Sequence, residues 1–364
     1  MSAPRLGFVG VGWIGAMRLD SVRQAGTAEV AALCDPSPEH LAAARAGSPG
    51  AACFEDLEEM LGRAGDLGLD GVVISTPNSF HVPQAVAALE QGLAVFCQKP
   101  LALDAEGARA VVKAARRAER LLGIDYTYRC TAGAQALRRL IRTGELGRVF
   151  SLDLTFHNAY GPDKPWCHDP AMAGGGALMD LGVHLVDLAM WLLGSRGVRS
   201  VHGLAFRDGL PLEGRGIDDF ATVQLELEGR AAVSLAVSWN AHLGRDCAIR
   251  AAAFGSAGGA EFRNVDGSFF DFELERTHGR TGQVVLSEGR EALGRALVEW
   301  IERLTESPGF DAEVEQAVLV SEVIDAVYGG APAAAAPVVV AAPLPEEAPV
   351  PAPQNAEAIF AHGT

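Results

Sequence analysis

The chain has 364 residues, and 49% of them are hydrophobic, which suffices for about two domains of roughly 150 residues with cores of their own. The 46 acidic residues outnumber the 30 basic ones, and a formal net charge of −16 argues against nucleic acid or an anionic membrane as a partner. The 6 cysteines are scattered singly, so neither a disulfide framework nor a zinc site is expected.

At the N-terminus, an apolar run at residues 6–9 leads directly into glycines, without the basic and long apolar regions of a signal peptide. No uninterrupted span of about 20 apolar residues follows it. These features predict a cytoplasmic protein.

Residues 6 to 126 alternate short apolar runs with alanine-rich helical stretches. We predict strands at 6–9, 30–34, 51–54, 72–75, 94–97 and 121–125, separated by helices at 14–24, 38–46, 57–61, 82–91 and 104–120. Strands that alternate with helices in this way form a parallel, doubly wound sheet. The pattern therefore predicts an α/β fold whose first domain spans residues 1–126.

Beyond residue 126 the pattern becomes richer in strands. We predict a helix at 134–143, a strand at 148–157, an apolar helical segment at 178–193, strands at 198–206, 220–227, 231–239, 246–254 and 269–274, and helices at 291–305 and 311–327. This order favours a second, α+β domain, residues 127–330, with an open and largely antiparallel sheet. Residues 331–364 are rich in alanine and proline and are expected to form a flexible tail.

A glycine motif joins the first predicted strand to the first helix. Gly10, Gly12 and Gly15 form G-x-G-x-x-G, in which Gly10 permits a tight turn, Gly12 lets the backbone approach a pyrophosphate, and Gly15 allows close packing. The helix start, with Trp13 and Ile14, supplies N–H groups and a positive dipole end. The motif predicts a Rossmann-type dinucleotide site.

Asp35 lies 20 residues beyond Gly15, at the end of the second predicted strand. A carboxylate at this place can accept hydrogen bonds from the adenosine ribose hydroxyls. It would repel a 2′-phosphate, and no Arg or Lys follows directly, so we expect NAD, with NADP less favoured. The alternative is an incidental glycine-rich turn in which Asp35 only caps the next helix.

Polar residues follow the ends of two later strands, where ligands bind in open parallel sheets. We expect the cofactor to be lined there by Ser75, Thr76, Pro77, Asn78, His81, Gln98 and Lys99. The prolines could equally serve only to end the strands, and His81 could simply begin a helix.

An ionisable stripe lies on the apolar segment 178–193. At about 100° per residue of a helix, Asp180, His184, Asp187 and Trp191 share one narrow face with apolar residues on both flanks. Because burial of unpaired charged groups is costly, the stripe should open onto a polar cavity or be paired internally. We interpret it as facing the substrate; the alternatives are a structural Asp–His pair and a metal site, for which no further ligand motif is present.

Taken in order, these motifs resemble the Gfo/Idh/MocA oxidoreductases, which include glucose-fructose oxidoreductase and inositol dehydrogenase. The resemblance covers roughly residues 5–330 and rests on the glycine motif, Ser-Thr-Pro-Asn with His81, Lys99-Pro100, Tyr128-Arg129 and Gly-Gly-Gly-x-x-x-Asp-x-Gly-x-His from Gly174. It implies an N-terminal Rossmann domain and a C-terminal domain whose open sheet carries the substrate pocket and commonly an oligomer interface.

The resemblance further implies that Lys99, Asp180 and His184 form the catalytic group and contact the substrate. The glutamate that usually precedes the lysine is Gln98 here, which keeps the shape of that side chain but loses its charge. The tail beyond residue 330 has no counterpart in the family.

From this constellation we expect an NAD-dependent dehydrogenase that transfers hydride between nicotinamide and a secondary alcohol of a sugar, cyclitol or related polyol. His184 would be the general base, because its ordinary pKa of about 6.5 suits proton transfer near neutrality. Lys99 would bind the reacting oxygen and share the proton, and Asp180 would orient His184 or hold a neighbouring hydroxyl.

The loop at 157–169 is a candidate substrate rim, in which Tyr160 and Trp166 would contact the substrate together with Arg129; an ordinary surface loop is the alternative. Two other functions remain open, namely a redox-neutral enzyme that uses bound NAD for transient oxidation and a non-catalytic NAD- or sugar-sensing protein. A homo-oligomer, dimer or tetramer, is expected.

Overall fold

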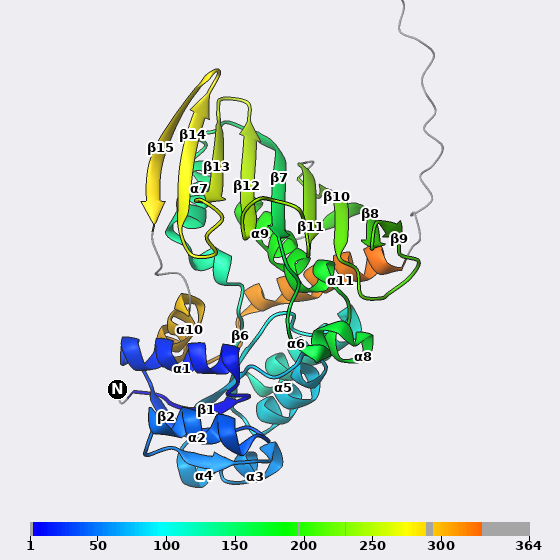
Figure 1. Cartoon of the computed structure of the whole chain (residues 1–364). Helices are drawn as coiled ribbons and strands as arrows, with labels where there is room; N and C mark the ends of the chain where they lie inside the picture. The colour runs from blue at the N-terminus through cyan, green and yellow to red at the C-terminus, as the bar shows by residue number, and fades with distance from the viewer. Residues whose placement is uncertain (1–2, 196, 230, 289–293, 330–364) are drawn as a thin grey trace, which may run out of the picture. The chain divides into compact units, whose positions relative to one another are not determined.

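We describe residues 3–195, 197–229, 231–288 and 294–329 of a computed structural model of the chain (Figure 1). The predicted tail at 331–364 lies outside the described residues, as does the start of the helix predicted at 291–305. Two sheets organise the described residues, one of six strands and one of nine.

The six-stranded sheet has the order β3-β2-β1-β4-β5-β6, and its neighbouring strands pair in parallel. Its strands are β1 (Arg5–Val9), β2 (Glu29–Cys34), β3 (Ala52–Phe54), β4 (Gly71–Ile74), β5 (Ala94–Cys97) and β6 (Leu122–Ile124). The helices between them are α1 (Trp13–Ala25), α2 (Pro38–Ala46), α3 (Leu57–Gly62), α4 (Ala64–Leu67), α5 (His81–Glu90) and α6 (Ala105–Ala118). The predicted doubly wound sheet is confirmed, and its strand order reverses between β1 and β4, where such sheets bind ligands.

Local chemistry explains why several bounds in this half were predicted closely. Helix α2 has the predicted bounds because Ser37 caps it, accepting a hydrogen bond from the His40 N–H at 3.3 Å, and because Pro38 suits a first helical turn. In α6 the cap is Asp104, whose side chain accepts from the Gly107 N–H at 2.8 Å. Helix α4 was not predicted, because four residues are too few to show the spacing of apolar residues that indicates a helix.

The nine-stranded sheet has the order β15-β14-β13-β12-β7-β11-β10-β8-β9. Its strands are β7 (Val149–Asn158), β8 (Val198–Arg207), β9 (Leu210–Pro211), β10 (Phe220–Leu227), β11 (Ala232–Ser238), β12 (Cys247–Gly255), β13 (Gly259–Asn264), β14 (Phe272–His278) and β15 (Thr281–Glu288). β7 pairs in parallel with β11, and the other neighbouring pairs are antiparallel, as predicted for most of this sheet.

The sequence-based prediction was wrong at one end of this sheet. The strand expected at 269–274 is β14, which starts three residues later, and β13, β15 and the short β9 were not predicted. In β13 the side chains of Glu261 and Arg263 alternate with apolar ones, and the glycines at its start were interpreted as a turn. In β15 both Val284 and Val285 are about half exposed, so no apolar alternation marks the strand.

Three helices pack against one face of the nine-stranded sheet (Figure 1): α7 (Ala132–Arg142), α9 (Val183–Leu193) and α11 (Gln316–Tyr328). The helical run Pro170–Leu193 is long and apolar enough to cross a membrane, but 89% of its most apolar window is buried inside the protein, so it is the central helix of this core. A further helix, α10 (Arg295–Glu306), packs beside α1 on the six-stranded sheet. The short turns are η1 (Asn78–Phe80), η2 (Thr127–Cys130), η3 (Pro165–His168), α8 (Pro170–Ala173), η4 (Leu178–Gly182) and η5 (Ala312–Glu315).

Candidate active site

The glycine loop after β1 has the geometry that its sequence predicts. Gly10 has a φ of +78°, and a Cβ there would lie 2.8 Å from the Ser75 carbonyl oxygen. A Cβ on Gly15 would lie 2.0 Å from the Gly10 carbonyl oxygen, so this glycine allows the loop to pack against itself. Near Gly12, a Cβ would approach only the His40 ring, at 3.6 Å. The backbone at Gly12 is thus open toward the crevice.

The N-terminus of α1 fits a pyrophosphate. Its N-cap is Gly12, no side chain caps the helix, and its first turn carries no acidic residue. The first N–H groups of a 13-residue helix are therefore available together with its positive dipole end. Trp13 stands beside them with 69% of its surface exposed.

Asp35 is buried at the end of β2 and ties the glycine loop to it. Its carboxylate accepts hydrogen bonds from the Val11 N–H at 2.8 Å and the Ser37 N–H at 2.9 Å, and lies 3.2 Å from His40 Nδ1. Since Ser37 caps α2, Asp35 is not the helix cap of the alternative interpretation. Two backbone donors leave acceptor capacity on the carboxylate for a ribose hydroxyl.

The segment after β4 forms a turn held by buried hydrogen bonds. Asn78 donates to the Ala173 carbonyl at 2.9 Å, and Thr76 Oγ1 donates to Gln84 at 2.6 Å. The His81 ring is fully buried, and its nitrogens lie 2.7 Å and 2.8 Å from the carbonyl oxygens of Pro100 and Thr76. His81 begins α5 and connects two loops of the crevice, so its place is behind the crevice wall, and burial lowers its pKa.

Lys99 and Asp180 meet although 81 residues separate them in the chain. Lys99 Nζ donates to Asp180 Oδ1 at 2.5 Å and to the Asp180 carbonyl at 2.9 Å. The other carboxylate oxygen of Asp180 accepts from Trp239 Nε1 at 3.1 Å. Lys99 follows β5 and Asp180 lies in η4, so this contact joins the two halves of the chain at the carboxyl end of the parallel sheet. Sequence reasoning missed Trp239, which ends a predicted strand without a motif of its own.

Gln98, the departure from the family pattern, belongs to a buried polar cluster. Its amide donates to Asp125, and Arg18 Nε donates to the same carboxylate oxygen at 2.5 Å. Arg18 and Asp125 are 4% and 1% exposed. Asp125 is thus the charged partner of Arg18. It follows β6, whereas the usual glutamate would follow the neighbouring strand, β5. Sequence reasoning also missed Arg18 and Asp125; a charged residue on the apolar side of α1 was the available signal.

The three glycines before Asp180 are required by close contacts. A Cβ on Gly176 would lie 1.8 Å from the Asp218 carbonyl oxygen, and one on Gly175 would lie 2.3 Å from the Tyr328 hydroxyl. Asp218 is fully buried and accepts from the Gly176 and Leu178 N–H groups and from the Tyr328 hydroxyl, at 3.0, 2.9 and 2.6 Å. This anchor fixes the start of η4, a π-helical turn, and hence the direction of Asp180.

His184 lies one turn further, in a pocket of aromatic rings. Its ring centroid is 5.1 Å from that of Tyr128, 6.4 Å from that of Phe156 and 6.5 Å from that of Tyr126. The residue is 8% exposed, and Nδ1 is buried with no hydrogen-bond partner among the described residues. Burial, with the positive charges of Lys99 and Arg18, holds its pKa well below the ordinary value.

The predicted stripe does not form one surface. Asp180 and His184 lie in the candidate site, but Asp187 is buried and paired with Arg129, whose Nε donates to it at 2.7 Å. Arg129 also donates to Glu313 at 3.1 Å and lines a different cavity. The stripe is therefore divided between the candidate site and an internal ion pair. Arg129 is not brought to the Lys99–Asp180 pair.

The loop expected to form a substrate rim lies beside Asp180. The ring of His168 packs against that of Trp239 at 6.1 Å, and Trp239 holds Asp180. Trp166 is half-buried in η3. Tyr160 is 52% exposed and its ring contacts that of Phe269 at 6.4 Å.

A doubly wound sheet with an open helix N-terminus, next to a lysine, a carboxylate and a histidine, is the arrangement of an oxidoreductase that binds a dinucleotide. Comparison with known families agrees. Residues 4–126 match the family described as "Oxidoreductase family, NAD-binding Rossmann fold", and residues 134–261 match the "GFO/IDH/MocA C-terminal domain". The chain belongs to the Gfo/Idh/MocA oxidoreductase family, which confirms the resemblance and the NAD-binding Rossmann domain.

Several curated relatives are named as dehydrogenases or reductases. Inositol 2-dehydrogenase of Corynebacterium glutamicum is 30% identical over 249 residues, which cover 68% of this chain and 70% of the relative. D-glucoside 3-dehydrogenase of Escherichia coli is 31% identical over 180 residues, 49% of this chain and 50% of the relative. This chain is accordingly a dehydrogenase-type enzyme.

Solved structures share the fold. An oxidoreductase domain protein from Kribbella flavida has a TM-score of 0.77 at 24% identity, with 90% of this chain and 97% of the other covered. The aldose-aldose oxidoreductase of Caulobacter crescentus has a TM-score of 0.78 at 22% identity, with the same coverage. At these identities the likeness establishes the fold.

Proposed function

We propose that the chain is an NAD-dependent dehydrogenase that acts on a secondary alcohol of a sugar, cyclitol or related polyol. The observation that carries the proposal is the Lys99–Asp180 contact at the carboxyl end of the parallel sheet, with His184 one helical turn from Asp180. The names of the relatives, an inositol dehydrogenase and a glucoside dehydrogenase among them, support a polyhydroxylated substrate.

Each of the three residues has a role that its surroundings favour. Lys99 has three N–H donors, of which Asp180 takes two, so one is left for the reacting oxygen. His184 is neutral at physiological pH because its pKa is lowered, and a neutral imidazole can accept the hydroxyl proton. Asp180, with its side chain 38% exposed, can accept from a neighbouring hydroxyl.

The cofactor supplies the hydride chemistry when it is bound. Within the crevice, Gly12, Trp13, Ile14 and Gly15 would hold the pyrophosphate at the start of α1, and Asp35 would hold the adenosine ribose. The carboxylate of Asp35 favours NAD over NADP, because a 2′-phosphate would meet a negative charge there. Ser75, Thr76 and Pro77 would line the opposite wall, after β4.

We also propose that the chain forms a homo-oligomer through the face of the nine-stranded sheet opposite α7, α9 and α11. Leu204 and Phe254 lie on that face with 61% and 44% of their surfaces exposed. The charged side chains on this face are paired, since Arg250 pairs with Asp153 and Glu261, and Arg263 pairs with three glutamates, so that two arginines face four carboxylates. Paired charges cost less to bury in a contact than unpaired ones.

The test is to follow absorbance of NADH while sugars, inositols and sugar acids are screened, with chromatography of the products in parallel. The proposal expects NADH formation that Lys99→Ala and His184→Ala each reduce strongly while NADH binding persists. Near-normal turnover in either variant would contradict the proposed mechanism. Product formation without net NADH would instead indicate a redox-neutral enzyme, and ligand binding without turnover a sensor.

A further inference from the structure

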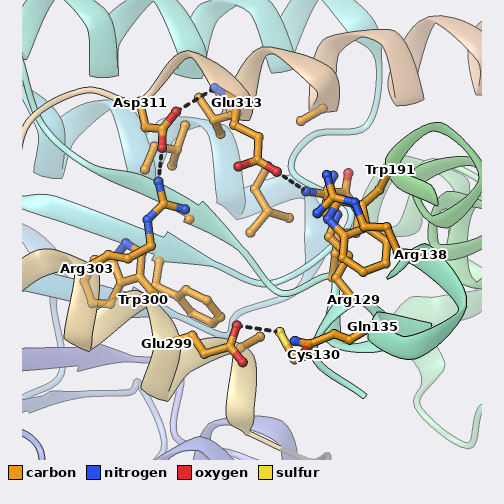
Figure 2. Close-up of a pocket in the computed structure, with 18 residues that line it drawn as sticks. Arg129, Cys130, Gln135, Arg138, Trp191, Glu299, Trp300, Arg303, Asp311 and Glu313 are labelled. Carbon is orange, nitrogen blue, oxygen red and sulfur yellow. Dashed lines mark hydrogen bonds and ion pairs between the residues drawn. The ribbon is translucent and has the colours of Figure 1, made fainter. Parts of the chain in front are cut away.

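A cavity of about 300 Å³ lies at the outer edge of the six-stranded sheet, beside β6 (Figure 2). Its walls come from β6, η2, α7, α9, α10 and the start of α11. Among the described residues that line it, none belongs to the group Lys99, Asp180 and His184. Its volume is at the lower end of the range of about 300–1,000 Å³ that small-molecule pockets occupy.

The charged side chains around this cavity are paired, except for one. The pairs are Arg129 with Asp187 and Glu313, Arg303 with Asp311, and Arg295 with Glu299. Arg138 has no carboxylate partner among the described residues, and its Nε is buried without a hydrogen bond. Its guanidinium instead stacks on the ring of Trp191 at 4.2 Å, beside Arg129 (Figure 2). One positive charge in the cavity wall is therefore uncompensated.

A second polar group in the wall is also without a partner. Trp300 is 4% exposed, and its Nε1–H is buried with no acceptor among the described residues. The indole packs against Phe96, with ring centroids 5.7 Å apart, and against Gly123, where a Cβ would lie 2.4 Å from Cδ1. Buried donors in native proteins almost always have an acceptor. This N–H has no surface open to the cavity, so the indole contributes an apolar wall, and the unpaired Arg138 is the group that indicates a ligand with acceptor atoms.

We propose that this cavity is a second ligand site that binds a small organic anion, with its carboxylate on Arg138 and a flat apolar body beside Phe96 and Trp300. The planar guanidinium matches a carboxylate with two parallel hydrogen bonds, and its stacking on Trp191 holds the plane in place. The site is independent of the proposed polyol chemistry.

Isothermal titration calorimetry of the full chain, saturated with NADH, tests this assignment. The probe is 4-hydroxybenzoate, and 4-hydroxybenzamide is its neutral isostere. The benzoate is expected to bind, and the amide to bind about tenfold more weakly or worse, because a hydrogen bond to a charged group is lost. Arg138→Gln should weaken benzoate binding by a similar factor, and Arg138→Lys by less. The matched control is Arg139→Gln, since Arg139 is the next residue of α7 and is exposed.

Thermal unfolding and NADH affinity of each variant show whether it is folded. A second variant, Trp191→Phe, replaces the broad ring on which the Arg138 guanidinium stacks, and it should also weaken benzoate binding. The proposal is overturned if the benzoate does not bind, if the amide binds equally well, or if folded Arg138→Gln binds the benzoate as the unmodified chain does. Displacement of the benzoate by a polyol substrate would also overturn it, because the probe would then occupy the active site.

Discussion

Lys99, Asp180 and His184 come from positions far apart in the chain, and the surroundings of each determine its charge. The ammonium of Lys99 faces the carboxylate of Asp180, and the imidazole of His184 is enclosed by Tyr126, Tyr128 and Phe156. An aromatic enclosure near a cation disfavours a second positive charge. The site therefore combines a charged hydrogen-bond donor with a neutral base.

This arrangement predicts the pH dependence of catalysis. With its pKa well below the ordinary value, His184 stays neutral as the pH falls through about 6.5, so kcat/KM for alcohol oxidation should not decline until the pH is lower than that. The measurement is initial NADH formation across the acid range, with His184→Asn as the control for residual rate. If kcat/KM instead fell on the acid side with an apparent pKa at or above the ordinary value of histidine, this would contradict a neutral His184 as the base.

Trp239 is predicted to be a positioning residue for Asp180. Trp239→Phe removes the N–H that donates to Asp180 Oδ2 and keeps an aromatic ring beside His168. A lost hydrogen bond to a carboxylate is worth about 1.5–3 kcal/mol, so kcat should fall by roughly tenfold or more. Because Trp239 does not line the glycine loop, the affinity for NADH measured by fluorescence should be unchanged. An unaltered kcat, or an equal loss in NADH affinity, would contradict this role.

Gln98 gives a prediction about stability. Gln98→Glu would place a second carboxylate against Asp125, with Arg18 as the one cation of that cluster. The pKa of the introduced carboxyl should be raised by the charge of Asp125, so the variant should lose stability as the pH rises, by roughly 2 kcal/mol near pH 8. Denaturant unfolding at pH 5 and pH 8 measures the loss.

Two further variants separate charge from shape at this position. Gln98→Met lacks the added charge, so its stability deficit should not grow with pH. Combining Gln98→Glu with Asp125→Asn restores the charge count and should recover most of the stability. A Gln98→Glu protein as stable as the unmodified chain at both pH values would show that the cluster tolerates the second carboxylate.

At the scale of elements, the start of η4 depends on the contact of Gly175 with Tyr328 and of Gly176 with Asp218. Gly176→Ala would push a methyl group into the Asp218 backbone, whose carbonyl accepts from the Ala177 N–H and whose carboxylate accepts from the Gly176 and Leu178 N–H groups. We expect a loss of stability of about 3 kcal/mol or more, with a fall in kcat because Asp180 follows four residues later. Gly62→Ala, at an exposed helical position with open space around it, should be neutral or slightly stabilising.

Denaturant unfolding compares the two glycine variants directly. Equal stability of Gly176→Ala and Gly62→Ala would show that the turn before Asp180 adjusts to a side chain.

Elements whose limits depend on local chemistry could be predicted from the sequence. The parallel sheet, α2 with its Ser37 cap and the glycine loop are of this kind. The π-helical turn at η4 could not be predicted, because it results from contacts with Asp218 and Tyr328, which come from distant parts of the chain. Trp239, the partner of Asp180, could not be predicted for the same reason, because no short motif records a contact across the fold.

At the scale of the whole molecule, the net charge of −16 does not show where the positively charged side chains lie. Lys99 and Arg18 are each paired with a carboxylate on the crevice side, and the start of α1 is left open there, while Arg138 is unpaired among the described residues in the cavity beside β6. The two regions share α9, because His184 lies in the active site and Trp191, seven residues later, lies under Arg138. A long buried helix thus contributes to both places, which composition alone does not indicate.

The open face of the nine-stranded sheet leads to the last prediction. Leu204 and Phe254 are exposed on it, at the sides of an ion-pair network in which carboxylates outnumber arginines. Light scattering on the full chain should give a dimer or tetramer, and Leu204→Glu combined with Phe254→Glu should shift the mass toward that of one chain. Added charges of one sign would face one another across a contact between two copies, which costs free energy. Phe80→Glu is the control, since Phe80 is 45% exposed and lies in η1, outside the nine-stranded sheet. A monomeric unmodified chain, or a double variant that keeps its assembled mass, would contradict this interface.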